Sequence, residues 1–336
     1  MVVLVATGAG FLIFTPKGAV ATAPAYPIAS NVPLPTVLLI HGYGFFNTCP
    51  SDNGTQKWGT VVPFLHSHGW QDIKTIGFYA CDTNQDVYLD NYGRFPGADT
   101  RNHEDYYASS PCNCVTHQIV ADGRMSHTKD TDIRHLAYHL AWYIWDTYTQ
   151  FGKPVVIVAH SLAGLIVRWL LYAIQYPQTV GQGLFPPRVF IPQIVTLIAP
   201  NAGISVIGEV LPTYQAEEMN SGSSFMQELE LHALDPQSAD GTDWTLIGNY
   251  PADRDFVVTA ASATAMDHVH RVLYFANSIY THNNILDDAS LKFDAHVYLC
   301  DNCLHTVRII NDGFLRYTSM PHSLNYINAA LLSSDW

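Results

Sequence analysis

Charged residues are scarce in this sequence, and basic residues are especially few. Only 13% of the 336 residues are charged, and 16 Lys and Arg face 29 Asp and Glu, which gives a net charge of −13. Because no basic run occurs anywhere, the chain has nothing with which to neutralise a phosphate backbone, and we expect no nucleic-acid partner. Low charge together with 48% hydrophobic residues contradicts the composition of disordered chains. We therefore expect a folded globular protein.

Repeats, heptads and apolar runs long enough to span a bilayer are also missing, which excludes solenoids, coiled coils and an integral membrane span. The longest apolar run covers residues 2–14 and is interrupted by Thr7 and glycines. Small residues at 19–23 then offer an A-x-A cleavage context, so residues 1–23 are predicted to be a signal peptide, although no basic segment precedes the run. An apolar segment packed on the domain is the alternative. We predict secretion.

The six cysteines form an even set, which in an exported chain favours disulfides. The alternative is a zinc site made by four of them, Cys112, Cys114, Cys300 and Cys303. The C-x-C spacing of the first pair is a poor match to the usual C-x-x-C knuckle. We therefore expect no metal, and nothing in the sequence calls for a cofactor.

Strand and helix patterns alternate along the chain and predict an α/β fold, with a mostly parallel sheet covered by helices on both faces. Apolar, β-branched runs predict strands at residues 36–40, 73–80, 155–158, 194–199, 244–248 and 272–276. Apolar stripes predict helices over residues 58–65, from a cap at Thr131 to before Gly152, and over 162–176. Residues 24–336 are read as one domain, with loop-rich insertions at about 82–130 and 201–243 and a C-terminal extension from about 291.

A candidate nucleophile lies where one strand turns abruptly into a helix. Ser161 follows the strand in the sequence Ala159-His160-Ser161-Leu162-Ala163-Gly164. Such a nucleophile elbow needs small neighbours, because the serine occupies a strained turn that pushes its Oγ outward. Both flanking positions carry alanine where the G-x-S-x-G motif has glycine. The alternative, a serine that only caps the helix, leaves the loop at His41 unexplained.

Acyl transfer also needs two backbone N–H groups that stabilise an oxyanion. The residue after the serine, Leu162, supplies one of them. The other is expected from the loop after another parallel strand, and the segment His41-Gly42-Tyr43-Gly44 follows the strand at 36–40. Tyr43 is therefore the candidate for the second N–H donor. Without the elbow, His41-Gly42 would be read only as the turn that ends a strand.

These motifs resemble the α/β-hydrolase superfamily, and within it the secreted bacterial lipases and esterases. The resemblance covers residues 36–290 and depends on the HGYG loop at 41–44, the AHSLAG elbow at 159–164, and a strand ending in LIAP at 197–200 before Asn201-Ala202-Gly203. It implies an α/β-hydrolase fold and a triad in the chain order Ser, Asp or Glu, His. Ala163, the two insertions and the tail depart from the pattern.

The resemblance also assigns the acid and the base. A loop after the strand at 244–248 carries Asp253 and Asp255, and the family's Asp-x-Val-Val-like pattern selects Asp255. The loop at Tyr280-Thr281-His282 resembles the one that carries the catalytic histidine, which makes His282 the general base. His160 is read as structural. The rivals for the base are His268, His270, His305 and His322.

The sequence thus predicts a secreted carboxylic-ester hydrolase, lipase or esterase, acting on a small-molecule or lipid ester through an acyl-enzyme. The insertions are expected to shape its substrate cleft. An acyltransferase, thioesterase or polyester depolymerase would use the same triad, and a non-catalytic binding protein on this fold is the alternative from another class. A disulfide between Cys49 and Cys81 is a further hypothesis, since both follow strands at the active-site edge.

Overall fold

The computed structural model describes residues 33–43, 57–79, 82, 84–89, 129, 131–180, 183–204, 213–249, 257–274, 281–282, 285–286, 295–298 and 323–332. The chain divides into the units Met1–Pro33 and Leu34–Trp336, and every element below belongs to the second. The predicted signal peptide and all six cysteines lie outside the described residues. The disulfide, zinc and secretion predictions therefore stay predictions.

Eight described strands form one sheet in the order β3-β2-β1-β4-β5-β6-β7-β8. Strands β1 to β7 pair in parallel, and only β8 runs antiparallel, against β7. The fold-class prediction, a mostly parallel α/β sheet, is confirmed. The strand bounds are β1 Thr36–Ile40, β2 Ile73–Gly77, β3 Val87–Tyr88, β4 Val155–His160, β5 Gln193–Leu197, β6 Asp243–Asn249, β7 His270–Tyr274 and β8 Ala295–Tyr298.

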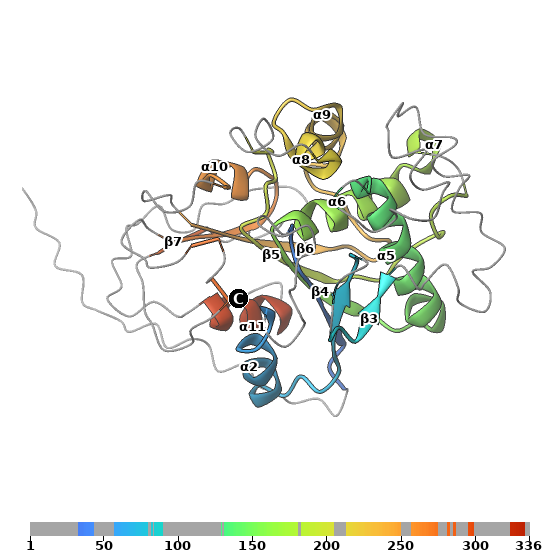
Figure 1. Cartoon of the computed structure of the whole chain (residues 1–336). Coiled ribbons are helices and arrows are strands. Elements are labelled where there is room, and N and C mark those ends of the chain that lie inside the picture. The colour runs from blue at the N-terminus through green and yellow to red at the C-terminus, as the bar shows by residue number, and fades with distance from the viewer. Residues whose placement is uncertain are drawn as a thin grey trace, which may run out of the picture. The chain divides into compact units, whose positions relative to one another are not determined.

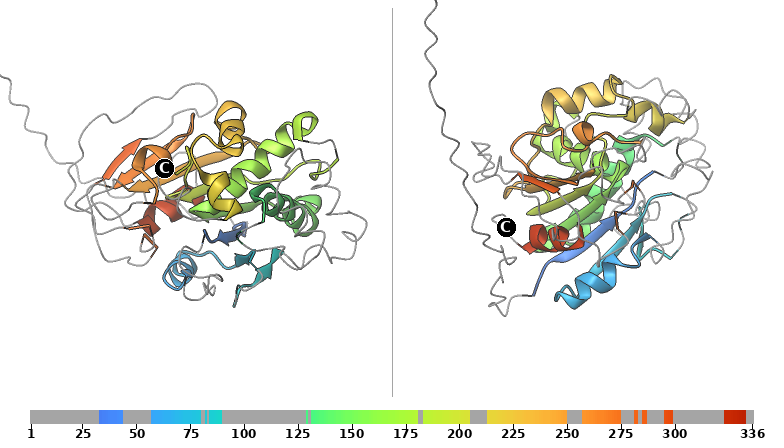
Figure 2. Two further views of the ribbon diagram at one scale, coloured as in Figure 1. Left: turned by 45° about the horizontal axis from the view of Figure 1, so that its top comes forward. Right: turned by 90° about the vertical axis from the view of Figure 1, so that its left-hand side faces the viewer.

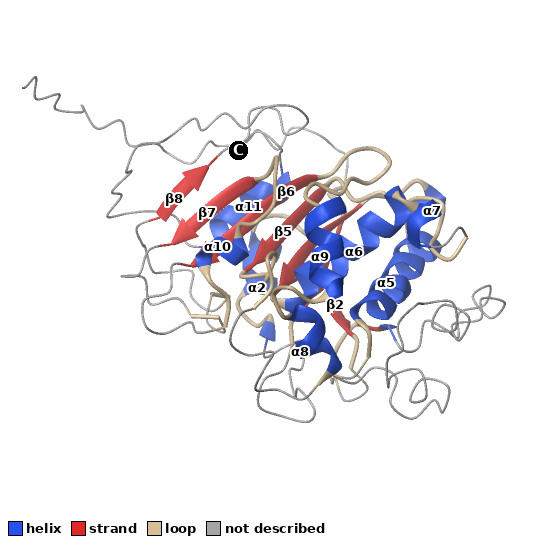
Figure 3. Ribbon diagram, turned by 90° about the horizontal axis from the view of Figure 1, so that it is seen from above, coloured by secondary structure: helices blue, strands red, loops and turns tan. Residues whose placement is uncertain are grey.

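Helices cover both faces of this sheet (Figures 1 and 3). One face carries α2 (Val61–Ser67) and α11 (Ser323–Leu332), and α11 packs on β4, β5 and α2. The other carries α5 (Ile133–Thr147), α6 (Leu162–Gln175) and α10 (Ala260–Ala263). The remaining described helices are η2 (Thr149–Phe151), α7 (Pro177–Val180), α8 (Tyr214–Met219) and α9 (Ser224–His232). Figure 2 shows the sheet lying between these two sets of helices.

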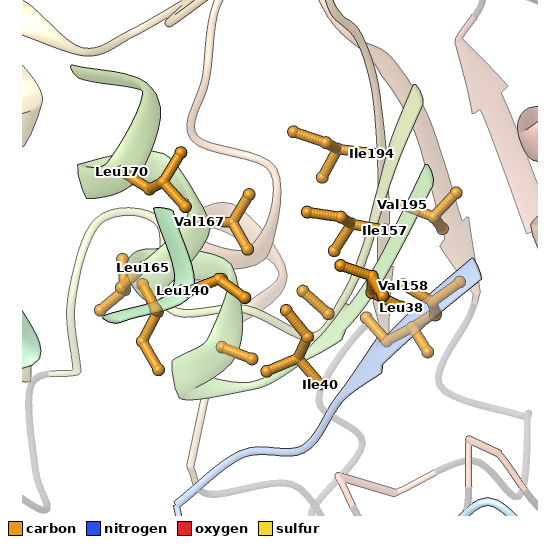
Figure 4. Packing of buried hydrophobic residues seen from close by; sticks show 14 of the residues in the cluster. Leu38, Ile40, Leu140, Ile157, Val158, Leu165, Val167, Leu170, Ile194 and Val195 are labelled. Atoms are coloured by element: carbon orange, nitrogen blue, oxygen red, sulfur yellow. The ribbon is translucent and has the colours of Figure 1, made fainter. Parts of the chain in front are cut away.

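The hydrophobic core lies where the central strands meet α6. Every residue of β1 and of β4 is buried, which explains why the sequence gives continuous apolar runs there instead of an alternating pattern. Figure 4 shows Ile157 and Ile194 facing Val167 and Leu170 across this interface. Burying a side chain of this size stabilises the fold by about 1.5–3 kcal/mol. The packing holds the carboxyl ends of β1 and β4 together.

Strand register brings the two predicted site loops to the same edge of the sheet. Ile40, the last residue of β1, pairs with Ala159 of β4, and His160 pairs with Leu197 of β5. The chain leaving β1 therefore passes beside the turn that follows β4. Carboxyl ends of adjacent parallel strands are the usual place for a site in α/β sheets.

Three local predictions are corrected. Asp132, not Thr131, is the N-cap of α5, because its carboxylate accepts from the N–H of Arg134. The strand predicted at 73–80 ends at Gly77, since the Asp82 carboxylate takes the N–H groups of the next two residues, Phe78 and Tyr79. The first insertion, predicted to be irregular, contributes β3 to the sheet.

The second insertion was predicted to be irregular but contains α8 and α9. Thr213 and Ser223 cap these helices through their hydroxyls. The fully buried Arg168 of α6 holds the insertion in place, donating to the carbonyls of Asn201, Leu229 and Ala233 at 2.6–2.9 Å. Two of these carbonyls belong to the end of α9, where a cation also complements the helix dipole.

Candidate active site

Ser161 occupies a strained turn between β4 and α6. Its backbone has φ 56° and ψ −126°, a conformation that L side chains rarely adopt. The turn is held from both sides, because the Ser161 N–H donates to Leu197 O at 2.9 Å and its carbonyl accepts from Gly164 N at 3.0 Å. An observed outlier of this kind is typical of a functional site. The elbow predicted at 159–164 therefore has the strain that its motif requires.

The packing explains why this elbow tolerates alanine at position 163. A Cβ added to Gly164 would lie 2.4 Å from the Cβ of Ala199, whereas Ala163 fits as it stands, buried. The position that must lack a side chain is therefore 164. On the other side of the serine, a Cβ on Gly42 would lie 2.5 Å from Ser161 Cβ. The loop after β1 thus lies directly against the serine.

His282 lies within hydrogen-bond distance of the serine. Its Nε2 is 2.8 Å from Ser161 Oγ, although the two residues are 121 positions apart in the chain. His160 donates its Nε2–H to the carbonyl oxygen of His282 at 2.7 Å, which ties the histidine segment to the end of β4. Ser161 and His282 are both nearly fully buried. The geometry is that of a hydroxyl beside its general base.

Burial also sets the charge state of the two histidines. Loss of solvation lowers the pKa of His282 to about 3, and the positive charge of Lys57 acts in the same direction. The pKa of His160 is lowered well below its usual value, first by burial and then by Lys57. A neutral imidazole has one ring nitrogen free to accept a proton. His282 is therefore present in the form that a general base requires.

Two backbone N–H groups flank the serine. Leu162 is the first residue of α6, so its N–H has no acceptor within the helix and lies at the positive end of the helix dipole. Tyr43 follows Gly42, the residue that lies against Ser161. The structure thus brings Ser161, His282, Tyr43 and Leu162 to one edge of the sheet. Donors of this type stabilise an oxyanion in acyl transfer.

A buried pair behind the predicted oxyanion loop has no counterpart among the sequence predictions. His41 Nε2 is 2.8 Å from Asp82 Oδ2, and both side chains are fully buried. The Phe78 ring stacks on the His41 imidazole at a centroid distance of 4.3 Å. The only sequence signal is a histidine directly before the loop glycine, because Asp82 lies 41 residues away in a stretch that we read as an insertion.

The second insertion reaches Tyr43, the predicted oxyanion donor. The hydroxyl of Tyr43 lies 2.9 Å from that of Thr213, the cap of α8, and Lys129 Nζ lies 5.0 Å from the centroid of the Tyr43 ring. Tyr79 donates its hydroxyl hydrogen to Gln215 of the same helix at 2.7 Å. The start of the insertion is thus part of the surroundings of the site.

The remaining candidates fall into two groups. Asp255, its competitor Asp253, and the rival bases His305 and His322 lie outside the described residues. His270 is the first residue of β7 and its Nε2 is 3.3 Å from Asp243, at the amino-terminal ends of two parallel strands and so opposite Ser161. His268 comes just before β7 at that same edge. Neither is placed beside the serine.

Two absences concern the part of the chain that the structure describes, residues 33–332 with the gaps given above. No three His, Cys, Asp or Glu side chains gather there as a metal site. None of the helices in that part of the chain combines the length and apolar character needed to cross a membrane.

Comparison with known proteins gives likenesses of fold alone. No family model matches the chain, and no curated protein matches it in sequence. Among solved structures it is similar to the phospholipase PlaB of Legionella pneumophila, at 15% identity and a TM-score of 0.40 over 68% of this chain and 45% of that one. The chain thus spans less than half the length of that phospholipase.

Two further structures are similar at the same level. Aspergillus fumigatus lipase B has 14% identity and a TM-score of 0.38 over 75% of this chain and 49% of its own. The esterase of the archaeon Pyrobaculum calidifontis has 12% identity and a TM-score of 0.37 over 75% of this chain and 70% of its own. The parallel sheet and its strand-turn-helix elbow give this chain an α/β-hydrolase fold.

Proposed function

We propose that the chain is a carboxylic-ester hydrolase that works through a serine acyl-enzyme. One observation carries this proposal: Ser161 Oγ lies 2.8 Å from His282 Nε2 at a strained elbow. The N–H of Leu162 is the expected second feature of such a site, since a helix begins there. A serine that served only as a helix cap would not need this backbone strain or a buried imidazole on its hydroxyl.

In this mechanism Ser161 Oγ attacks the ester carbonyl carbon while its proton passes to His282 Nε2. The N–H groups of Leu162 and Tyr43 stabilise the resulting oxyanion. The bond to the leaving alkoxide breaks as His282 returns the proton to it. Water then attacks the acyl-enzyme, His282 takes the proton of the water and passes it to Ser161 Oγ, and the carboxylic acid leaves.

Asp255 is proposed as the acid that orients His282, on the family pattern alone. Asp255→Asn should then lower kcat about 10⁴-fold, as loss of the triad acid does elsewhere, while Asp253→Asn should leave it within a few-fold of wild type. If Asp253→Asn lowers kcat more than Asp255→Asn does, Asp253 is the acid.

Secretion also remains a proposal, and N-terminal sequencing of the exported protein tests it.

The decisive experiment measures hydrolysis of chromogenic esters from short to long acyl chains. Ser161→Ala should abolish activity, and Ser67→Ala, which removes an exposed hydroxyl on α2, serves as the matched control. A fluorophosphonate should label the wild type and not Ser161→Ala, with mass spectrometry locating the adduct on Ser161. A folded wild type that neither hydrolyses any ester nor reacts with the phosphonate would contradict the proposal. Labelling without hydrolysis would favour transfer to an acceptor other than water.

A further inference from the structure

One peptide unit links His41 to the proposed oxyanion hole. The carbonyl oxygen of Gly42 is 2.9 Å from His41 Nδ1, and because a carbonyl can only accept, Nδ1 must carry the proton. That carbonyl and the N–H of Tyr43 belong to the same planar trans peptide. In such a unit the C=O and N–H point in opposite directions. The bond from His41 therefore fixes the direction in which Tyr43 presents its N–H.

The other ring nitrogen of His41 is fixed by Asp82. Oδ2 of Asp82 lies 2.8 Å from His41 Nε2 and also accepts from the N–H groups of Phe78 and Tyr79 at 2.8 and 2.9 Å. Gly77 makes room for this carboxylate, since a Cβ there would lie 3.0 Å from Oδ2. Both ring nitrogens of His41 thus face acceptors. The ring is therefore held from both sides and cannot turn away from the Gly42 carbonyl without breaking its contact with Asp82.

We infer that His41 is a positioning residue for the proposed ester hydrolysis. Asp82 holds the His41 ring, which donates a hydrogen bond to the Gly42 carbonyl and so orients the Tyr43 N–H toward the oxyanion. This inference rests on the proposed function. Gly42 is a residue that needs such a restraint, because glycine allows its peptide to rotate more freely than other residues do. Hydrogen bonds in a chain also polarise one another, so the bond to the carbonyl strengthens the N–H on the other side of the peptide.

Two amide variants separate this role from simple anchoring. Asn places an N–H near the position of Nδ1, so His41→Asn keeps a donor for the Gly42 carbonyl and loses the contact with Asp82. His41→Gln places its N–H near Nε2 and does the reverse. His41→Phe removes both. Circular dichroism and thermal unfolding select the temperature at which all variants are folded.

A positioning role predicts that kcat falls most where the Gly42 bond is lost. His41→Gln and His41→Phe should lower kcat about 10²–10³-fold, the usual effect of one oxyanion donor, with little change in KM. His41→Asn should retain at least ten times the kcat of His41→Gln. Equal loss in both amide variants, or more activity in His41→Gln, would show that His41 only anchors Asp82 and would overturn the inference.

A spectroscopic measurement decides the point even if no ester is hydrolysed. In protein labelled with 15N-histidine, the signals that disappear in His41→Asn belong to His41. They should show that Nδ1 carries a proton, as its bond to the Gly42 carbonyl requires. A wild-type His41 whose Nδ1 carries no proton would overturn the inference on its own. Absence of phosphonate labelling at Ser161, in contrast, would count against the proposed function. The hydrogen bond of the His41 ring would still be tested by the spectrum alone.

Discussion

His160 donates its Nε2–H to the main-chain carbonyl of His282 at 2.7 Å, so the residue before the proposed nucleophile holds the segment that carries the proposed base. The two rings lie with centroids 5.0 Å apart. From the sequence, His160 is predicted to be structural. The contact defines this structural role, because it fixes the distance between His282 and Ser161.

Removing this contact should therefore slow the chemistry. His160→Phe is expected to lower kcat about 10²-fold, because a displacement of about 1 Å in a reacting group has an effect of that size. His160→Gln, whose amide N–H lies near the position of Nε2, should restore most of the rate. Steady-state kinetics measure both, and a phenylalanine variant with wild-type kcat would show that the contact does not position the base.

Stability should decrease on acidification because two buried histidines stay neutral in the folded state. The pKa of His282 is lowered to about 3 and that of His160 well below 6.5. Below pH 6.5 the unfolded chain binds protons that the folded chain does not. The free energy of unfolding therefore has its highest value above pH 6.5 and decreases as the pH is lowered from there. Each of the two histidines lowers the free energy of unfolding by about 1.4 kcal/mol for every unit by which the pH is decreased.

Urea unfolding between pH 7.5 and 5 measures this slope. His160→Asn should reduce the slope by close to one proton, since one of the two buried histidines is then gone. The same slope in the variant and the wild type would mean that His160 is protonated in the folded protein.

Gly42→Ala should inactivate the protein more than it destabilises it. Its Cβ would meet Ser161 Cβ at 2.5 Å and His160 O at 2.9 Å, so the oxyanion loop or the serine must shift. We expect a loss in kcat of about 10²-fold or more. Gly152→Ala is the control, because its φ of 69° makes alanine unfavourable by about 1 kcal/mol but its surroundings are open. The control should keep full activity per folded molecule.

Arg168→Lys should destabilise the fold despite retaining the charge. Arg168 donates from three nitrogens to three buried carbonyls, and a single ammonium group cannot reach all of them. The expected loss in the free energy of unfolding is about 3 kcal/mol, from carbonyls left without donors. Arg188→Lys, at an exposed position, should change it by less than about 0.5 kcal/mol. Similar values for the two variants would rule out an anchoring role for Arg168.

Local sequence patterns were enough to predict where most strands of the sheet lie. The strand predicted at residues 36–40 has those bounds in the structure, and those at 155–158 and 244–248 are extended by one or two residues. Fully buried parallel strands leave a continuous apolar signal, which is readable without partners. The second insertion was misread because α8 and α9, with 6 and 9 residues, are too short to show a clear apolar periodicity, although Phe225, Met226 and Leu229 of α9 are buried in the core.

The sequence by itself determined the class of fold and the position of the candidate nucleophile, because the strand, the small residues and the serine are contiguous. Only the tertiary structure brought His282 to within 2.8 Å of Ser161 and Asp82 to His41. Those contacts join residues 121 and 41 positions apart, and no local pattern encodes such distances. Strand order and register decide them, since the sheet must be assembled before its carboxyl edge exists.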